Sequence, residues 1–114
     1  MSEPISGNAL RGHLETMVLA TLEKGESHGF ELLQRLEAAG RGALAMKEGS
    51  LYPALYRLEN GGLIKGRWDT DSQTRGPRRR VYKLTRKGQR QLETGRRQWV
   101  QFVSVIGPIV GATA

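Results

Sequence analysis

Four arginines gather in one short stretch of the sequence, where their type and spacing suit the binding of phosphate groups. They are Arg75, Arg78, Arg79 and Arg80. A guanidinium group carries a permanent positive charge, and its planar fork of N–H donors matches the oxygens of a phosphate. Lys83, Arg86 and Lys87 follow closely, so that like charges crowd this stretch. Because such crowding is unfavourable unless a polyanion neutralises it, the pattern favours nucleic acid as the partner.

The distribution of charge along the whole chain agrees with this interpretation. The 114 residues carry a net charge of +7. Residues 1–56 contain five Lys or Arg against seven Asp or Glu, a balance of −2, and residues 57–114 contain thirteen against four, a balance of +9. Positive charge concentrated in one half is typical of proteins that bind a polyanion. On charge alone, a solubilising basic face and an anionic membrane surface remain alternatives.

A second group of candidate contact residues lies on a short helix predicted to begin at Ser50. Its apolar positions recur at helical spacing: Leu51, Ala54, Leu55 and Leu58. The step of 100° per residue places Pro53, Tyr56 and Arg57 on the water-facing side of this helix. Ser50 and Tyr52 lie at the edge of that side. We expect five residues there to contact DNA: Ser50, Tyr52, Pro53, Tyr56 and Arg57. Arg57 could pair with a guanine edge and Tyr56 with a phosphate or a thymine methyl group. For Tyr52, packing against the first turn of a neighbouring helix is an equal alternative.

The elements that must position these groups follow from hydrophobic periodicity and from turn residues. A first amphipathic helix is predicted over residues 10–22. A second begins after Ser27, its expected N-cap, and ends at the glycines of residues 40–42. Residues 43–46 could add one brief strand before the third helix, which Asn60-Gly61-Gly62 terminates.

A hairpin and a last helix complete the predicted order. Two strand-like segments, residues 63–68 and 79–84, flank a polar stretch that holds Gly76-Pro77. Thr85 is the expected cap of a helix over residues 86–106, which Gly107-Pro108 should interrupt.

This order predicts a mainly α (α+β) fold, a winged helix-turn-helix with a two-stranded wing and a C-terminal dimerisation helix. In such folds the third helix reads the major groove of DNA, and the wing arginines would reach phosphates or a narrow minor groove. The predicted organisation has four parts: a flexible N-terminus over residues 1–9, a DNA-binding domain over 10–85, the dimerisation helix over 86–106 and a tail over 107–114.

The last predicted helix carries an apolar seam with heptad-like spacing. We expect a homodimer interface made of Leu92, Trp99, Phe102, Val103 and Ile106. Packing of this seam against the first helix of the same chain is the alternative. Near a twofold axis, Trp99 and Phe102 could flank a small aromatic or lipophilic effector. Otherwise Trp99 anchors the interface core.

Several function classes find no support in the sequence. The chain has no cysteine, which excludes thiolate metal sites and favours a cytoplasmic location. Its two histidines, His13 and His28, match no metal or hydrolase signature, and no nucleotide-binding loop or nucleophile elbow occurs. No signal peptide or membrane-spanning stretch is expected. We therefore expect no enzyme activity, cofactor or metal. An interaction module without specific DNA binding is the main alternative.

Three blocks follow one another along the chain: LETMVLATLEKGESHGFELLQRL, GSLYPALYRLENGGLI and RRRVYKLTRKGQRQL. In this order they resemble the PadR family of winged-helix transcriptional regulators, and the resemblance covers about residues 10–106. It implies a homodimeric regulator, usually a repressor, whose C-terminal helix builds the dimer interface. Some members of the family respond to small aromatic or lipophilic compounds. The single C-terminal helix resembles the smaller subgroup that has no large effector domain.

Overall fold

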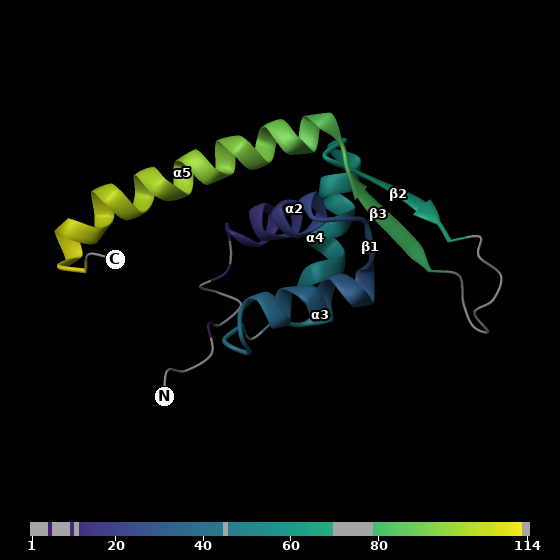
Figure 1. The fold of residues 1–114 in the computed structure, drawn as a ribbon, viewed down its shortest axis with the longest axis horizontal. Coiled ribbons are helices and arrows are strands. Elements are labelled where there is room, and N and C mark those ends of the chain that lie inside the picture. Colours follow the sequence, from purple (N-terminus) through teal and green to yellow (C-terminus); the bar gives the residue numbers. More distant parts are fainter. Residues whose placement is uncertain (1–4, 6–9, 11, 45, 70–78, 113–114) are drawn as a thin grey trace.

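The computed structural model describes residues 5, 10, 12–44, 46–69 and 79–112, and it is mainly helical (Figure 1). Its elements, in chain order, are α2 (Leu14–Glu23), β1 (Ser27–His28), α3 (Gly29–Ala39), α4 (Glu48–Asn60), β2 (Ile64–Trp68), β3 (Arg80–Leu84) and α5 (Arg86–Val110). The strands form an antiparallel sheet in the order β1-β3-β2. This architecture confirms the predicted mainly α winged helix-turn-helix.

The core is formed by the apolar faces that the periodicity predicted. Helices α2, α3 and α4 contribute Val18, Leu19, Leu22, Leu32, Leu33, Leu36, Leu51, Leu55 and Leu58, and the hairpin and α5 add Ile64, Tyr82 and Leu92. Burial of each large aliphatic side chain contributes about 1.5–3 kcal/mol. This shared core joins α4 to the hairpin of β2 and β3, whose two strands extend away from the C-terminal end of α5 (Figure 1).

Ser27 takes a different role from the one that the sequence predicted. It is buried in β1, where it pairs with Tyr82 of β3, and its hydroxyl donates to the carbonyl of His28 at 2.9 Å. The N-cap of α3 is His28, which makes no side-chain capping bond. The brief strand that residues 43–46 could have added is reduced to a single bridge in the described residues. Leu44 makes only an isolated bridge with Ile5, and the third strand of the sheet is β1.

The start of α4 and the end of α5 differ from the sequence prediction, whereas the end of α4 and the cap of α5 agree with it. Helix α4 begins at Glu48 with Lys47 as its N-cap, ahead of the predicted Ser50. Thr85 caps α5 as predicted, because its Oγ1 accepts a bond from the Gly88 amide at 3.0 Å. The predicted interruption at Gly107-Pro108 is wrong, and α5 continues to Val110. The helix can continue through Pro108 because this residue removes only one backbone hydrogen bond near the C-terminus. Gly111 ends the helix in the left-handed conformation, with φ of 76°.

The first half of α5 packs on α2. A methyl group at Gly95 would lie 2.9 Å from the Thr16 Oγ1 atom, so the two helices approach closely there. Arg96 donates to Glu23 at 2.7 Å, and the Gln89 amide donates to the same carboxylate at 2.6 Å. These bonds, the Arg96 contact above all, lower the pKa of Glu23 from 4.5 to about 2. The carboxylate therefore stays ionised well into acid, and the contact persists there.

Leu92 belongs to this intramolecular contact, which corrects its predicted place in the dimer interface. Its side chain is fully buried and lies in the core cluster with residues of α2 and α4. The alternative, in which the seam packs on the chain's own first helix, is therefore right for the first half of α5. Within the described part of the chain, no helix combines the length and apolarity needed to cross a lipid bilayer.

Candidate nucleic-acid interface

Helix α4 presents the predicted contact residues on one surface. Ser50, Tyr52, Pro53, Tyr56 and Arg57 are all exposed, whereas the opposite face is buried in the core. Tyr56 is the most open of the aromatic residues there, with 69% of its surface exposed. The orientation of α4 thus turns these side chains away from the core, and their contact with DNA stays a prediction.

Tyr52 combines packing with exposure. Its ring lies against Gly29 in the first turn of α3, where a methyl group would come 2.8 Å from the Tyr52 Cε1 atom. The side chain nonetheless remains 44% exposed. The packing alternative from the sequence is therefore present, and it leaves part of the side chain exposed.

Arg57 is not free in this structure. Its Nε donates to the Oε1 atom of Glu15 on α2 at 2.9 Å, and both side chains are about half exposed. An exposed ion pair of this kind contributes little stability, typically about 0–1 kcal/mol. It does hold the guanidinium at the α2 side of the α4 surface, and Glu15 is a site residue that sequence reasoning missed.

The predicted wing arginines fall into three cases. Arg75 and Arg78 lie outside the described residues. Arg79 is exposed, and its backbone carbonyl accepts the Asp69 amide at 2.7 Å, beside the strand pair of the hairpin. Arg80 is engaged inside the chain: its Nε donates to Glu59 Oε1 at 3.3 Å and its Nη2 donates to Glu59 Oε2. Arg80 is thus less available for phosphate than the sequence suggested.

Two further side-chain contacts join β2 and the residue after it to the segment around β1. Arg67 of β2 binds both carboxylate oxygens of Glu26 at 2.9 and 2.8 Å, and this contact holds the pKa of Glu26 below its usual range. His28 Nε2 lies 2.9 Å from the Oδ2 atom of Asp69 at the end of β2. Neither pairing has a signal in the sequence, because 41 residues separate the partners in both.

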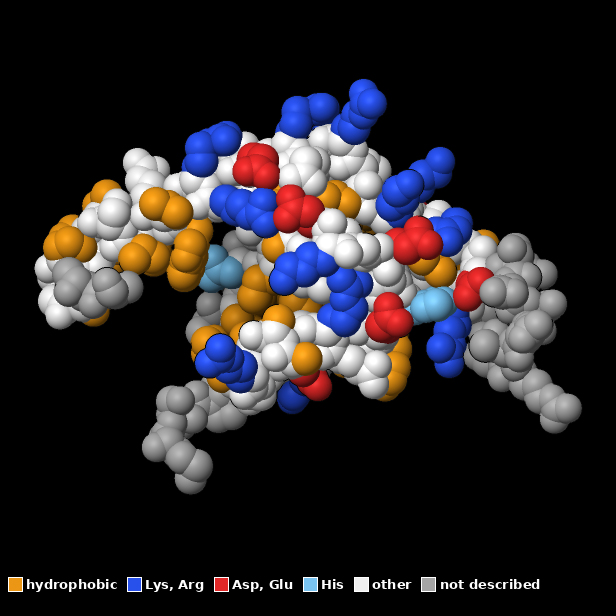
Figure 2. Space-filling view, viewed as in Figure 1, with side chains coloured by type: hydrophobic (Ala, Val, Ile, Leu, Met, Phe, Trp, Pro, Cys, Tyr) orange, Lys and Arg blue, Asp and Glu red, His pale blue; other side chains and the backbone are white. Residues whose placement is uncertain are grey.

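In the second half of α5, the rest of the described chain covers the predicted interface residues only in part. This half extends beyond the domain on the side away from the wing, and Figure 2 shows hydrophobic side chains gathered there. Trp99 and Phe102 are 53% and 52% exposed, Ile106 is exposed, and Val103 is half-buried. Trp99 and Phe102 stack with ring centroids 6.2 Å apart, and the edge of His13 meets Trp99 at 5.3 Å.

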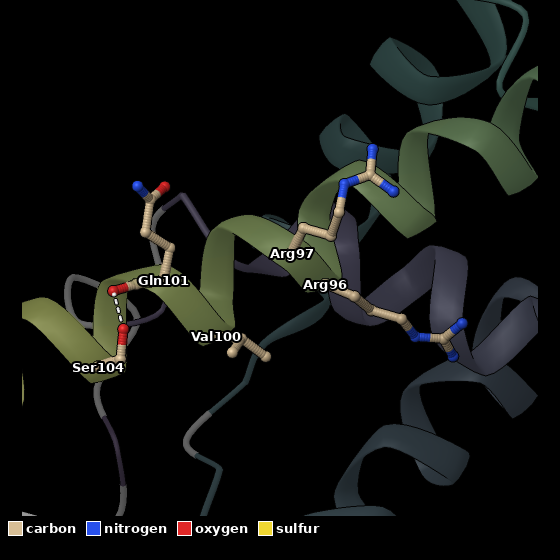
Figure 3. Close-up of a pocket in the computed structure, with 5 residues that line it drawn as sticks. All are labelled: Arg96, Arg97, Val100, Gln101 and Ser104. Carbon is tan, nitrogen blue, oxygen red and sulfur yellow. Dashed lines mark hydrogen bonds between the residues drawn. The ribbon is translucent and has the colours of Figure 1, made fainter.

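The opposite side of α5 carries a shallow concavity (Figure 3). Its lining consists of Arg96, Arg97, Val100, Gln101 and Ser104. All five side chains are exposed, and the Ser104 hydroxyl donates to the Gln101 carbonyl at 3.1 Å. Small-molecule sites usually enclose most of the ligand, so this open surface lacks the character of one. Among the described residues, no three metal-ligating side chains come together.

Comparison with known proteins places this geometry among transcriptional regulators. The Transcriptional regulator PadR-like family matches residues 18–94. A transcriptional regulator from Clostridium thermocellum is similar in structure, with a TM-score of 0.82, 28% identity and coverage of 91% of this chain and 99% of that one. A PadR-like regulator from Bacillus cereus has a TM-score of 0.75 and 32% identity, covering 91% and 97%.

A curated relative extends the comparison to a longer protein. Transcriptional regulator YqjI from Escherichia coli (strain K12) is 31% identical over 87 residues, which are 76% of this chain and 39% of YqjI. The chain therefore spans about two-fifths of the length of that relative.

Proposed function

Because the chain belongs to the PadR-like family of transcriptional regulators, we propose that it acts as a homodimeric repressor on an inverted-repeat operator. The family consists of DNA-binding regulators and not of enzymes, which agrees with the expectation from sequence. The exposed surface of α4 beside the wing carries the proposal, since these two elements contact the groove and the backbone in winged helices. The cytoplasmic location stays a prediction.

The uncovered half of α5 supports the homodimer. Trp99, Phe102 and Ile106 offer a run of exposed apolar surface, and aromatic side chains of this kind are typical anchors of protein interfaces. A second copy is the fitting occupant, because a twofold dimer lets the same patch cover itself. It also presents two copies of α4, which two half-sites of one operator can engage together.

Selection of bound duplexes from a random pool, followed by footprinting, tests this function. We expect an inverted repeat whose half-site centres lie about 10 bp, or a multiple of that, apart. Arg57→Ala should relax the preference at one base pair in each half-site and cost about 1–3 kcal/mol on the selected sequence. Glu15→Gln is the matched control, because it frees the Arg57 guanidinium and should retain the base preference.

Two outcomes would count against these assignments. Protection of a single unsymmetric site would contradict the dimer, and equal loss of affinity by Arg57→Ala on selected and random DNA would refute base reading. If the protein binds no duplex at all, the alternative function of an interaction module without specific DNA binding is favoured.

We further propose that a small aromatic or lipophilic effector releases the operator by binding between the α5 helices. The exposed stacked pair of Trp99 and Phe102 supports this, because its free faces could stack on a flat guest. Planar lipophilic compounds should then quench Trp99 emission and weaken operator binding in parallel, since an effector must prefer one conformation.

The fluorescence needs a background without the second tryptophan. Trp68→Phe suits this purpose, because it keeps an aromatic ring beneath the Arg80 guanidinium. If a panel of such compounds changes neither the emission nor the operator affinity, Trp99 serves the interface alone.

A further inference from the structure

Glu59 and Arg80 join the C-terminal end of α4 to the wing. Glu59 lies in the last turn of α4, and Arg80 is the first residue of β3. The guanidinium meets the carboxylate through two N–H groups, and its Nη2 also lies 3.3 Å from the Gly66 carbonyl of β2. Both side chains are about 30% exposed, so solvent screens this pair less than the Arg57–Glu15 pair. The Arg80 side chain thus connects its own strand, β3, to both α4 and β2.

The site is shaped to hold the guanidinium plane in one orientation. Trp68 pairs with Arg80 across the two strands, and its ring centroid lies 5.2 Å from the Arg80 Cζ atom. On the same face of the strand pair, a methyl group at Gly66 would come 2.6 Å from the Arg80 Nε atom, so the guanidinium lies close over Gly66. The Trp68 ring and the absence of a side chain at Gly66 together leave room for the flat guanidinium group on this face.

We propose that Glu59 is a positioning residue for DNA binding, which holds the wing through Arg80 so that Arg79 meets a phosphate when α4 lies in the groove. This inference rests on the proposed function, in which α4 and the wing bind DNA together. It assigns Arg80 to a contact within the chain, although its type and place in the sequence suggested a phosphate contact.

Charge argues against the alternative in which Arg80 leaves Glu59 to bind DNA. Its charge is already balanced by the carboxylate, so transfer to a phosphate would leave Glu59 unpaired close to the DNA backbone. Arg79, the neighbouring residue, is exposed, and no ion pair to its side chain occurs within the described residues. Of these two neighbouring arginines, Arg79 is therefore the one whose charge no carboxylate among the described residues balances.

A double-mutant cycle on DNA affinity tests the proposal. Arg79→Ala in the wild-type background should weaken binding and reduce the slope of log affinity against log salt by about 0.9 for each phosphate that the protein no longer binds. In a Glu59→Gln background the same change should have less than half of that effect, because the wing no longer holds residue 79 in place. Thermal unfolding of each variant separates this coupling from a loss of stability.

Two other variants sharpen the test. Glu26→Gln is the matched control, since it removes a bidentate pair with Arg67 from the same sheet and leaves the link to α4 intact. The effect of Arg79→Ala should there remain as in the wild type. Gly66→Ala displaces the Arg80 guanidinium while retaining both charged residues, so it should reproduce the effect of Glu59→Gln even if that variant folds poorly.

Three results would overturn the proposal. Independent, additive effects of Glu59→Gln and Arg79→Ala would show that no positioning occurs. Tighter binding with a steeper salt slope in Glu59→Gln would make Arg80 a direct DNA contact held back by Glu59. A wild-type protein that shows no salt-sensitive DNA binding would remove the proposed function as well, whereas the first two results leave that function intact.

Discussion

Operator binding should weaken by about 10³- to 10⁵-fold when the salt concentration rises from 50 to 200 mM, if the dimer makes about six to ten phosphate contacts. The physical reason is the release of counterions from DNA, which becomes less favourable as the bulk salt concentration rises. Positive charge on the second half of the chain supplies these contacts. The measurement is fluorescence anisotropy of a labelled operator duplex at a series of salt concentrations.

The structure indicates which arginines should determine the salt slope. Arg57, Arg67 and Arg80 are paired with carboxylates, so they should contribute less than unpaired cations. Replacement of both Arg78 and Arg79 by Ala should weaken binding to all duplexes alike, with a slope shallower by roughly one unit for each phosphate released. A nearly flat salt response of the wild type would contradict binding through phosphates.

Ile106→Glu should separate the dimer and lower operator affinity by about 10²- to 10⁴-fold, the range over which linked binding sites gain from acting together. Ile106 lies on the exposed apolar run of α5, and a carboxylate buried there against a second copy would have no partner. Sedimentation velocity gives the oligomeric state, and anisotropy on the inverted repeat gives the affinity.

Ser104→Glu provides the matched control for this change. Ser104 is also exposed on the same stretch of α5, but it lines the concavity on the opposite side of the helix. The same charge there should leave both the dimer and the operator affinity essentially unchanged. A dimer that survives Ile106→Glu would place the interface elsewhere on the molecule.

The correct predictions from sequence concern features that neighbouring residues decide. The leucines of α4 recur at helical spacing, so the side that carries Tyr56 and Arg57 had to face outward. The Thr85 cap was likewise predictable, because the bond joins residues only three positions apart. The family resemblance rests on such local blocks, and the family match over residues 18–94 confirms it.

The errors concern features that depend on distant parts of the chain. Ser27 has a residue type that suits an N-cap, yet pairing with β3 draws it into a strand. Leu92 and Trp99 share one heptad spacing, yet only the first lies where α2 can cover it. A periodic pattern shows that a face is apolar, but it does not show which partner covers that face.

The sequence by itself therefore determined the fold class, the family, the basic half of the chain and the outward surface of α4. Only the tertiary structure decided which arginines are available: Glu15 and Glu59 engage Arg57 and Arg80 across 42 and 21 residues. The reason is that helices and strands are specified largely by short-range periodicity and caps, whereas an ion pair forms wherever packing brings two side chains within reach. The spacing of residues along the chain therefore does not predict these ion pairs.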